Sequence, residues 1–227
     1  MSAPVPKYPP PDALPGEPAR AVLAAGTPVY RVHGTHRDAT AFNTRQAHPF
    51  YYGGRFDSTV YEPYGYAYIG LSVGAAVCEV LLRSVPFEGD GSVRLLPRAS
   101  FERRSLSFLK LAADTEVVSL MAGAELAAVA QDSWLVHAEG ADYPQTRDWG
   151  HWIRRGTAPW ARGFVWPSKR EPSDRVAVLF EDRCGGAVLE PAGPRPVDFG
   201  TPDGERWLNG VLAAYWAQGA PRAGGVL

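Results

Sequence analysis

The sequence predicts an α+β fold, with helices flanking a β-sheet core. Strand-like and helix-like segments follow one another without a regular β-α-β alternation, which argues against a doubly wound parallel sheet. The 227 residues are enough for one domain with a substantial core. Because there is no second Pro/Gly-rich linker between core-forming stretches, we expect a Pro-rich arm over residues 1–18, extended or disordered, and a single domain over residues 19–227.

The first elements of this domain are a strand and a long loop. β-Branched and aromatic residues predict a strand over residues 27–33. Strand alternation then places Val29, Arg31 and His33 on one face. Residues 34–65 are rich in Gly, Asn, Tyr and Pro and have no period, so we expect a loop whose length is typical of functional segments.

A second strand runs directly into a helix. Residues 66–71 alternate as a strand, with Tyr66 and Tyr68 on one face. Ser72 is a suitable N-cap for a helix that continues to about Arg83. The apolar stripe of this helix predicts one buried face.

The second half of the chain adds shorter elements of both kinds. Helical patterns cover residues 121–132 and 147–155, and short strands are expected at 163–166 and 176–181. A last helical pattern at 203–218 predicts a helical C-terminal extension. Strands and helices are thus mixed along the whole chain, as an α+β protein requires.

Composition excludes several classes of protein. The net charge is -1 and the pI about 6.5, so we expect no direct binding of nucleic acid. No apolar run approaches the roughly 18 residues of a membrane span. Residues 1–18 have no secretory h-region, and we therefore expect a cytoplasmic protein that does not enter the membrane. Cys78 and Cys184 lie far apart and are expected to be reduced.

Several cofactor and metal motifs are missing from the chain. The Gly-rich phosphate loop, G-x-G-x-x-G, H-E-x-x-H and G-x-S-x-G do not occur. The 5 histidines show no metal-ligand spacing with Cys or carboxylates. We therefore expect chemistry without a metal and without a bound redox cofactor.

Four segments carry the functional hypothesis: VYRVH at 29–33, GGRFD at 53–57, AYIGLSVGAAVCEVLLR at 67–83 and GFVWPSKR at 163–170. In their order and spacing they resemble the RES family, bacterial proteins named for an Arg, a Glu and a Ser. The stretch YPQTRDWGHWIRR at 143–155 is also similar to the family. The resemblance spans residues 27–182, and the family positions fall on Arg31, Arg55, Tyr68, Glu79 and Ser168.

The resemblance implies a fold related to ADP-ribosyltransferase toxins, with a mixed or antiparallel sheet core and flanking helices. It also implies an enzyme that cleaves the nicotinamide–ribose bond of NAD+ by hydrolysis or phosphorolysis, with NAD+ as substrate rather than cofactor. Many members are toxins paired with a helix-turn-helix, Xre-type antitoxin. On this basis we expect the catalytic residues Glu79, Arg31 and Ser168, and the NAD+-binding residues Arg31, Arg55, Tyr68, Tyr66 and Ser168.

The binding residues are chemically suited to NAD+. The planar forks of Arg31 and Arg55 can make bidentate, charge-assisted hydrogen bonds to the pyrophosphate. An aromatic face stacks well on nicotinamide. Tyr68 is the candidate for this stacking, with Tyr66 or Tyr52 as substitutes.

Glu79 and Ser168 are suited to the reacting centre. A positioned carboxylate stabilises oxocarbenium character at the ribose, and Ser168 would orient the ribose or the carboxamide. Judged alone, Glu79 also suits a solvent-exposed i, i+4 pair with Arg83, worth about 0.2–0.5 kcal/mol. Ser168 after Pro167 also suits an ordinary turn. The ordered set of positions favours the catalytic interpretation.

Three other functions stay open. An ADP-ribosyltransferase would use the same fold to modify a macromolecule, a nucleotide-binding module would keep the fold without turnover, and a metabolic enzyme would tailor a nucleotide. The Pro-rich arm and the C-terminal extension depart from a minimal RES domain. Either segment would suit contact with a partner or formation of a homodimer, so dependence on an antitoxin stays open.

Overall fold

The computed structural model describes residues 8–221 and confirms the α+β class. Nine strands of the described chain form the main sheet, which is antiparallel except where β6 pairs with β7. In pairing order these are β1 (Arg20–Leu23), β6 (Thr115–Ser119), β7 (Gly163–Pro167), β8 (Arg175–Phe180), β3 (Tyr66–Gly70), β2 (Pro28–Gly34), β5 (Arg104–Leu111) and β10 (Val197–Asp198), with β9 (Leu189–Pro191) also paired to β5. A separate parallel pair consists of β4 (Arg94–Leu96) and β11 (Ala217–Gly219).

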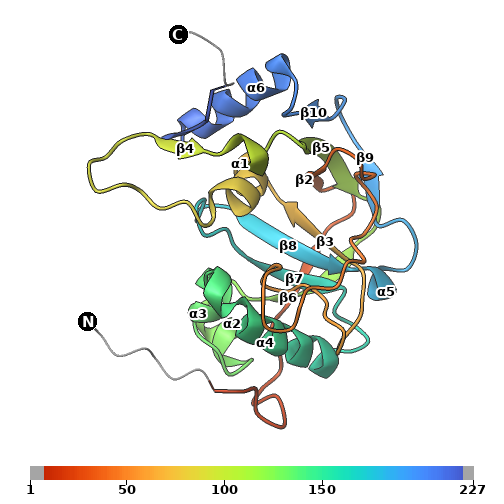
Figure 1. The fold of residues 1–227 in the computed structure, drawn as a ribbon. Coiled ribbons are helices and arrows are strands. Elements are labelled where there is room, and N and C mark those ends of the chain that lie inside the picture. The colour runs from red at the N-terminus through yellow and green to blue at the C-terminus, as the bar shows by residue number, and fades with distance from the viewer. Residues whose placement is uncertain (1–7, 222–227) are drawn as a thin grey trace.

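Mostly short helices surround the main sheet. In chain order they are α1 (Val73–Val77), the π-helical turn η1 (Cys78–Leu82), the 3-10 turn η2 (Arg98–Ser100), α2 (Gly123–Ala127), α3 (Trp134–His137), the 3-10 turn η3 (Gly140–Asp142), α4 (Tyr143–Gly156), α5 (Glu181–Cys184) and α6 (Pro202–Ala213). Figure 1 shows α2, α3 and α4 together beside β6 and β7, whereas α1 and α6 lie near β5. The two helix groups therefore cover different parts of the sheet.

The central strands are buried on both faces. Along β8, Val176, Val178 and Phe180 pack into a cluster with apolar residues of α2, α3 and α4. Ala177 and Leu179 belong to a second cluster on the other face. Burial on both faces explains why such strands have continuous apolar runs rather than an apolar/polar alternation.

Most strand predictions are confirmed. β2, β3, β7 and β8 lie within about one residue of the predicted ranges. The segment over residues 35–65 contains no helix or extended strand and carries only isolated β-bridges, as expected of a loop. Ser72 caps α1, because its side chain accepts a hydrogen bond from the backbone N–H of Ala75.

Three helix predictions are wrong in their bounds. The helix expected over 121–132 is only α2, and the chain reaches a left-handed φ of 55° at Ala130. The helix expected over 147–155 begins earlier, with Pro144 in the first turn, where a missing N–H costs no hydrogen bond. The helix expected over 203–218 ends with α6, because the chain turns at Trp216 and continues as β11.

The described part of the N-terminal arm lies against α4. Residues 8–18 contain no helix or strand, but the carbonyl of Tyr8 accepts a hydrogen bond of 3.3 Å from Trp149 Nε1. Leu14 packs against the apolar cluster that includes α4. Residues 1–7 of the predicted arm lie outside the described residues, and the division into an arm and a single domain stays a prediction.

The described residues show neither a metal-binding group nor a membrane span. Cys78 and Cys184 are both buried and free. Within residues 8–221, no cluster of three or more His, Cys, Asp or Glu side chains is placed to hold a metal ion. In the same part of the chain, no helix has the length and apolar character needed to cross a bilayer.

Candidate active site

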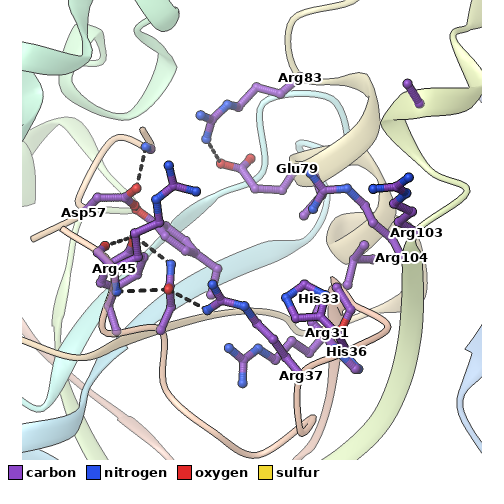
Figure 2. A pocket seen from close by; sticks show the side chains of 18 residues that line it. Arg31, His33, His36, Arg37, Arg45, Asp57, Glu79, Arg83, Arg103 and Arg104 are labelled. Atoms are coloured by element: carbon purple, nitrogen blue, oxygen red, sulfur yellow. Dashed lines mark hydrogen bonds and ion pairs between the residues drawn. The ribbon is translucent and has the colours of Figure 1, made fainter. Parts of the chain in front are cut away.

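A cavity of about 560 Å³ collects many of the charged residues in the family-like segments. It opens between β2, the start of β5, η1 and the loop that precedes β3. Six arginines and two carboxylates line it, an excess of four positive charges when the histidines are counted as neutral. In Figure 2 each carboxylate has an arginine beside it, Arg83 at Glu79 and Arg45 at Asp57, and the other four lining arginines come from β2, the loop after it and the start of β5. The cavity is therefore electrically asymmetric, with its surplus positive charge toward β2 and β5.

Glu79 lies on the cavity wall and contacts two arginines. The helix begins after Ser72 and widens at Cys78 into η1, a kind of turn that is frequent at functional sites. Glu79 Oε1 lies 2.7 Å from Arg83 Nη1 and 3.5 Å from Arg55 Nη1. Oε2 is buried, and no described residue donates a hydrogen bond to it. The pair with Arg83 exists, but the solvent-exposed alternative is wrong, because only 5% of the Glu79 side chain is exposed.

Arg55 is fully buried and does not line the cavity. Its Nη2 donates a hydrogen bond of 3.3 Å to the carbonyl of Ala138, and its guanidinium lies 5.8 Å from the centre of the Trp166 ring. Burial lowers the pKa of Arg55, and attraction to Glu79 opposes that change. The Arg55 fork thus lies against Glu79 and outside the cavity lining, and its expected contact with the pyrophosphate stays a prediction.

Tyr68 and Asp57 form a hydrogen-bonded pair at the acidic side of the cavity. Tyr68 Oη donates to Asp57 Oδ1 at 3.0 Å and accepts from the backbone N–H of Phe56 at 2.9 Å. The backbone N–H of Gly54 donates to Asp57 Oδ2 at 2.7 Å, and a Cβ on Gly54 would lie 2.5 Å from Asp57 Oδ1. The absence of a side chain at Gly54 therefore permits the close approach of Asp57. Burial and Asp57 raise the pKa of Tyr68, so the phenol keeps its proton.

Tyr66 shares the cavity with Tyr68, whereas Tyr52 does not. The two rings stand edge to face with centres 5.8 Å apart. Tyr66 Oη donates to the Arg45 carbonyl at 3.1 Å and accepts from Asn43 Nδ2 at 2.7 Å. Tyr52 is 89% exposed on the preceding loop. Of the three aromatic candidates, the structure therefore brings together two.

Arg31 enters the cavity from β2. Its Nη1 donates to the carbonyls of Ala39 at 2.8 Å and Ala41 at 2.6 Å, which orients the guanidinium. None of the described residues accepts a hydrogen bond from its other two nitrogens. Burial, together with the neighbouring Arg37, lowers the pKa of Arg31 to about 10. His33 lines the same cavity, as the alternation along the strand predicts.

Ser168 follows β7 and is fully buried. Its backbone N–H donates to the Asp174 carbonyl at 2.9 Å, but its Oγ has no hydrogen-bond partner within residues 8–221. It lies two residues beyond Trp166, whose ring centre is 6.3 Å from that of Tyr68. The family-like positions thus fall into two groups. The first group lines the cavity and consists of Arg31, Tyr68 and Glu79. The second group, Arg55 and Ser168, is buried outside the cavity lining.

The sequence hypothesis missed several residues that shape the cavity. Asp57 and Arg83 stand inside the family-like segments, so their place there was an available signal. Arg147 is fully buried and anchors the loop before β3. Its guanidinium donates hydrogen bonds of 2.7 to 3.2 Å to four carbonyls, those of His48, Pro49, Tyr52 and Gly54. No local pattern in the sequence shows which carbonyls a buried arginine will contact. Nor does a local pattern place Arg37, Arg45, Arg103 and Arg104 in the cavity lining, where the structure has them.

Comparisons with known proteins address both the fold and the family. The model of the RES domain matches residues 28–200. Among solved structures, the chain is similar to one in the MbcT-MbcA toxin-antitoxin complex of M. tuberculosis, with a TM-score of 0.52 and 17% identity over 78% of this chain and 86% of that chain. This similarity concerns the fold and fits the ADP-ribosyltransferase-like arrangement. No curated protein matches the chain in sequence. Because the family model covers well over half of its residues, the chain belongs to the RES domain family.

Proposed function

We propose that the protein consumes NAD+ by cleaving the bond between nicotinamide and ribose. The observation that carries this proposal is the Glu79 carboxylate, held between two arginines on the wall of an electrically asymmetric cavity. NAD+ has a matching asymmetry, because its nicotinamide ring is cationic and its pyrophosphate is anionic. Membership of the RES family supports the same substrate.

The charges of the cavity suggest how NAD+ would lie in it. The nicotinamide and its ribose would occupy the side formed by Tyr66, Tyr68 and Glu79, where an aromatic face and a carboxylate meet a cation. The pyrophosphate would meet Arg31, whose guanidinium is already oriented by two carbonyls and has further N–H groups to donate. This pose places Glu79 beside the bond that breaks.

The chain then supplies electrostatic stabilisation for an ionic cleavage. The electron pair of the C1′–N bond leaves with nicotinamide, which becomes neutral, and positive charge develops on the ribose. Glu79 stabilises that charge, and a ribose hydroxyl would supply the donor that Oε2 lacks, since this oxygen is buried and accepts no hydrogen bond from a described residue. Arg55 and Arg83 hold the carboxylate in place. Addition of water to C1′ with release of a proton gives ADP-ribose. Addition of inorganic phosphate instead would give ADP-ribose phosphorylated at C1′, and addition of a nucleophile of a macromolecule would give an ADP-ribosylated macromolecule.

We assign this activity to a toxin that is paired with an antitoxin. The support is the family itself and the fold shared with a toxin-antitoxin complex. A helix-turn-helix partner that covers the cavity would block access of NAD+ to Glu79. The cytoplasm, where NAD+ is found, is the proposed site of action. Expression in a bacterial host should lower cellular NAD+ and colony counts for the wild type but not for Glu79→Gln.

The direct test incubates the pure protein with NAD+, with and without inorganic phosphate, and identifies the products by mass spectrometry. We expect nicotinamide release by the wild type and a loss of at least about 100-fold in Glu79→Gln, the effect of removing one preorganised electrostatic group. Glu88→Gln is the matched control, because Glu88 is exposed and outside the cavity lining. Absence of NAD+ turnover by the wild type would instead favour the nucleotide-binding module.

A further inference from the structure

The cavity carries more positive charge than a dinucleotide pyrophosphate needs. One lining arginine, Arg83, is paired with Glu79. The other five make no ion pair with any residue in the described part of the chain, namely Arg31, Arg37, Arg45, Arg103 and Arg104. A pyrophosphate diester carries two negative charges, which two guanidinium groups neutralise. With Asp57 counted as one further negative charge in the lining, two positive charges remain in excess.

Three of the five unpaired arginines are held in place by neutral oxygens. Arg31 donates to two backbone carbonyls, Arg37 Nη1 donates to Asn43 Oδ1 at 2.6 Å, and Arg104 Nε donates to the Ser100 carbonyl at 2.9 Å. These bonds orient the guanidinium groups without neutralising them. Because a fork that is already oriented loses less conformational entropy on binding, this arrangement favours an anion over solvent.

Arg31 is buried and Arg104 is half-buried, so the presence of further arginines in the same cavity lining opposes folding unless an anion binds. Burial and Arg37 lower the pKa of Arg31 to about 10, with Asp38 opposing them, and burial lowers the pKa of Arg104. Burial also lowers the pKa of His33, so this ring is mainly neutral near neutral pH and does not add to the positive charge. The unpaired charge therefore belongs to the arginines, and it is available to a ligand.

We propose that this basic end of the cavity binds a third phosphate group, carried on the adenosine ribose, so that the preferred substrate is the 2′-phosphorylated dinucleotide NADP+. The inference rests on the proposed function of the same site. Arg104 pairs with Gly34 at the end of β2, Arg103 directly precedes it, and Arg37 lies on the loop after β2, so the three arginines come from adjacent elements of the cavity lining. A phosphomonoester carries about 1.5 to 2 negative charges near neutral pH and three acceptor oxygens, which suits two or three arginine forks.

A binding experiment tests the phosphate site without any chemistry. Titration calorimetry compares adenosine 2′,5′-bisphosphate with 5′-AMP as the two probes. We expect the bisphosphate to bind at least about tenfold more tightly to the wild type, and the double variant Arg37→Ala/Arg103→Ala to lose that preference. Both side chains are exposed, so the double variant is expected to fold. Arg206→Ala, exposed on α6 and outside the cavity lining, is the matched control and should keep the preference. Equal binding of the two probes by the wild type would overturn the inference.

Turnover measurements separate this inference from the proposed function. Cleavage of NAD+ without any advantage for NADP+ would overturn the third phosphate site and leave the proposed function standing. A preference for the bisphosphate without cleavage of either dinucleotide would support the third phosphate site and overturn the proposed function. If free phosphate accelerates NAD+ cleavage in the wild type but not in the double variant, and NADP+ has no advantage, the surplus charge serves free phosphate and the inference fails.

Discussion

Replacing Glu79 by Gln is expected to destabilise the fold as well as to stop catalysis. The carboxylate faces Arg55, whose Nε and Nη1 are buried and have no hydrogen-bond partner among the described residues. The substituted amide is neutral, so Arg55 would keep its charge in a buried position without a counter-ion. Arg83 is less affected, because 14% of its side chain is exposed and can be hydrated.

The distance between the charges sets the size of this effect. At 3.5 Å and an effective dielectric constant of about 20, the attraction between Glu79 and Arg55 is about 5 kcal/mol. The new amide oxygen still accepts a hydrogen bond, which returns about 1–2 kcal/mol. We therefore expect the free energy of unfolding to fall by about 3 kcal/mol, at the lower end of what breaking a buried ion pair costs. For a chain of this size, that lowers Tm by about 6–12 °C.

The assay is thermal unfolding of the wild type, Glu79→Gln, Arg55→Met and the double variant. Methionine has a similar unbranched shape and carries no charge, so the double variant removes both members of the ion pair. Replacing a buried pair by uncharged groups is often neutral for stability. We expect the double variant to recover to within about 1 kcal/mol of the wild type, while nicotinamide release stays absent.

Two results would refute this reasoning. If Glu79→Gln melts within about 2 °C of the wild type, Arg55 does not depend on this carboxylate. If the two single substitutions add in the double variant, the interaction energy of the cycle is zero and the groups are uncoupled. Independently, full nicotinamide release by a folded Glu79→Gln protein would rule out the proposed chemistry.

Other buried polar groups have effects of their own. Arg147→Lys should expose the loop over residues 48–54 to proteases, because one ammonium group cannot replace a fork that bonds four carbonyls. Ser168→Ala should raise the free energy of unfolding in urea by about 1 kcal/mol, because it removes a buried hydroxyl without a partner, and its kcat/KM tests the expected contact with NAD+. The free energy of unfolding should fall as pH drops below about 6.5, by up to about 1.4 kcal/mol per pH unit for each of two histidines. Burial lowers the pKa of His33 and His151, so the unfolded chain takes up protons at a higher pH than the folded chain does.

Each of these outcomes has a control and a contradicting result. Arg175→Lys, exposed on β8, should leave protease resistance unchanged, and unchanged resistance in Arg147→Lys would contradict the anchoring role. A loss of stability in Ser168→Ala would show that its hydroxyl has a stabilising partner. Replacing His33 and His151 by Gln should flatten the acid limb of the stability profile, and an unaltered slope would contradict their burial as neutral rings.

Local sequence determined the central strands and the start of the first helix. The strand over residues 28–34 was predictable from β-branched and aromatic residues, and Ser72 was recognisable as an N-cap from its own chemistry. The end of the last helix was not predictable in the same way. Residues 217–219 leave the helical pattern to pair with β4, a contact with a segment far away in the chain. Such pairing overrides local propensity.

The candidate site divides in a similar way. Sequence by itself brought Arg31, Tyr68 and Glu79 into one hypothesis, and the structure places all three on one cavity. Only tertiary structure decided that Arg55 lies buried against Glu79, that Ser168 lies outside the cavity lining, and that six arginines from distant segments line one cavity. The physical reason is that residue type and strand alternation are local properties. Burial and charge pairing depend on which distant segments pack together, and that is set by the register of the sheet and the anchoring of the loops.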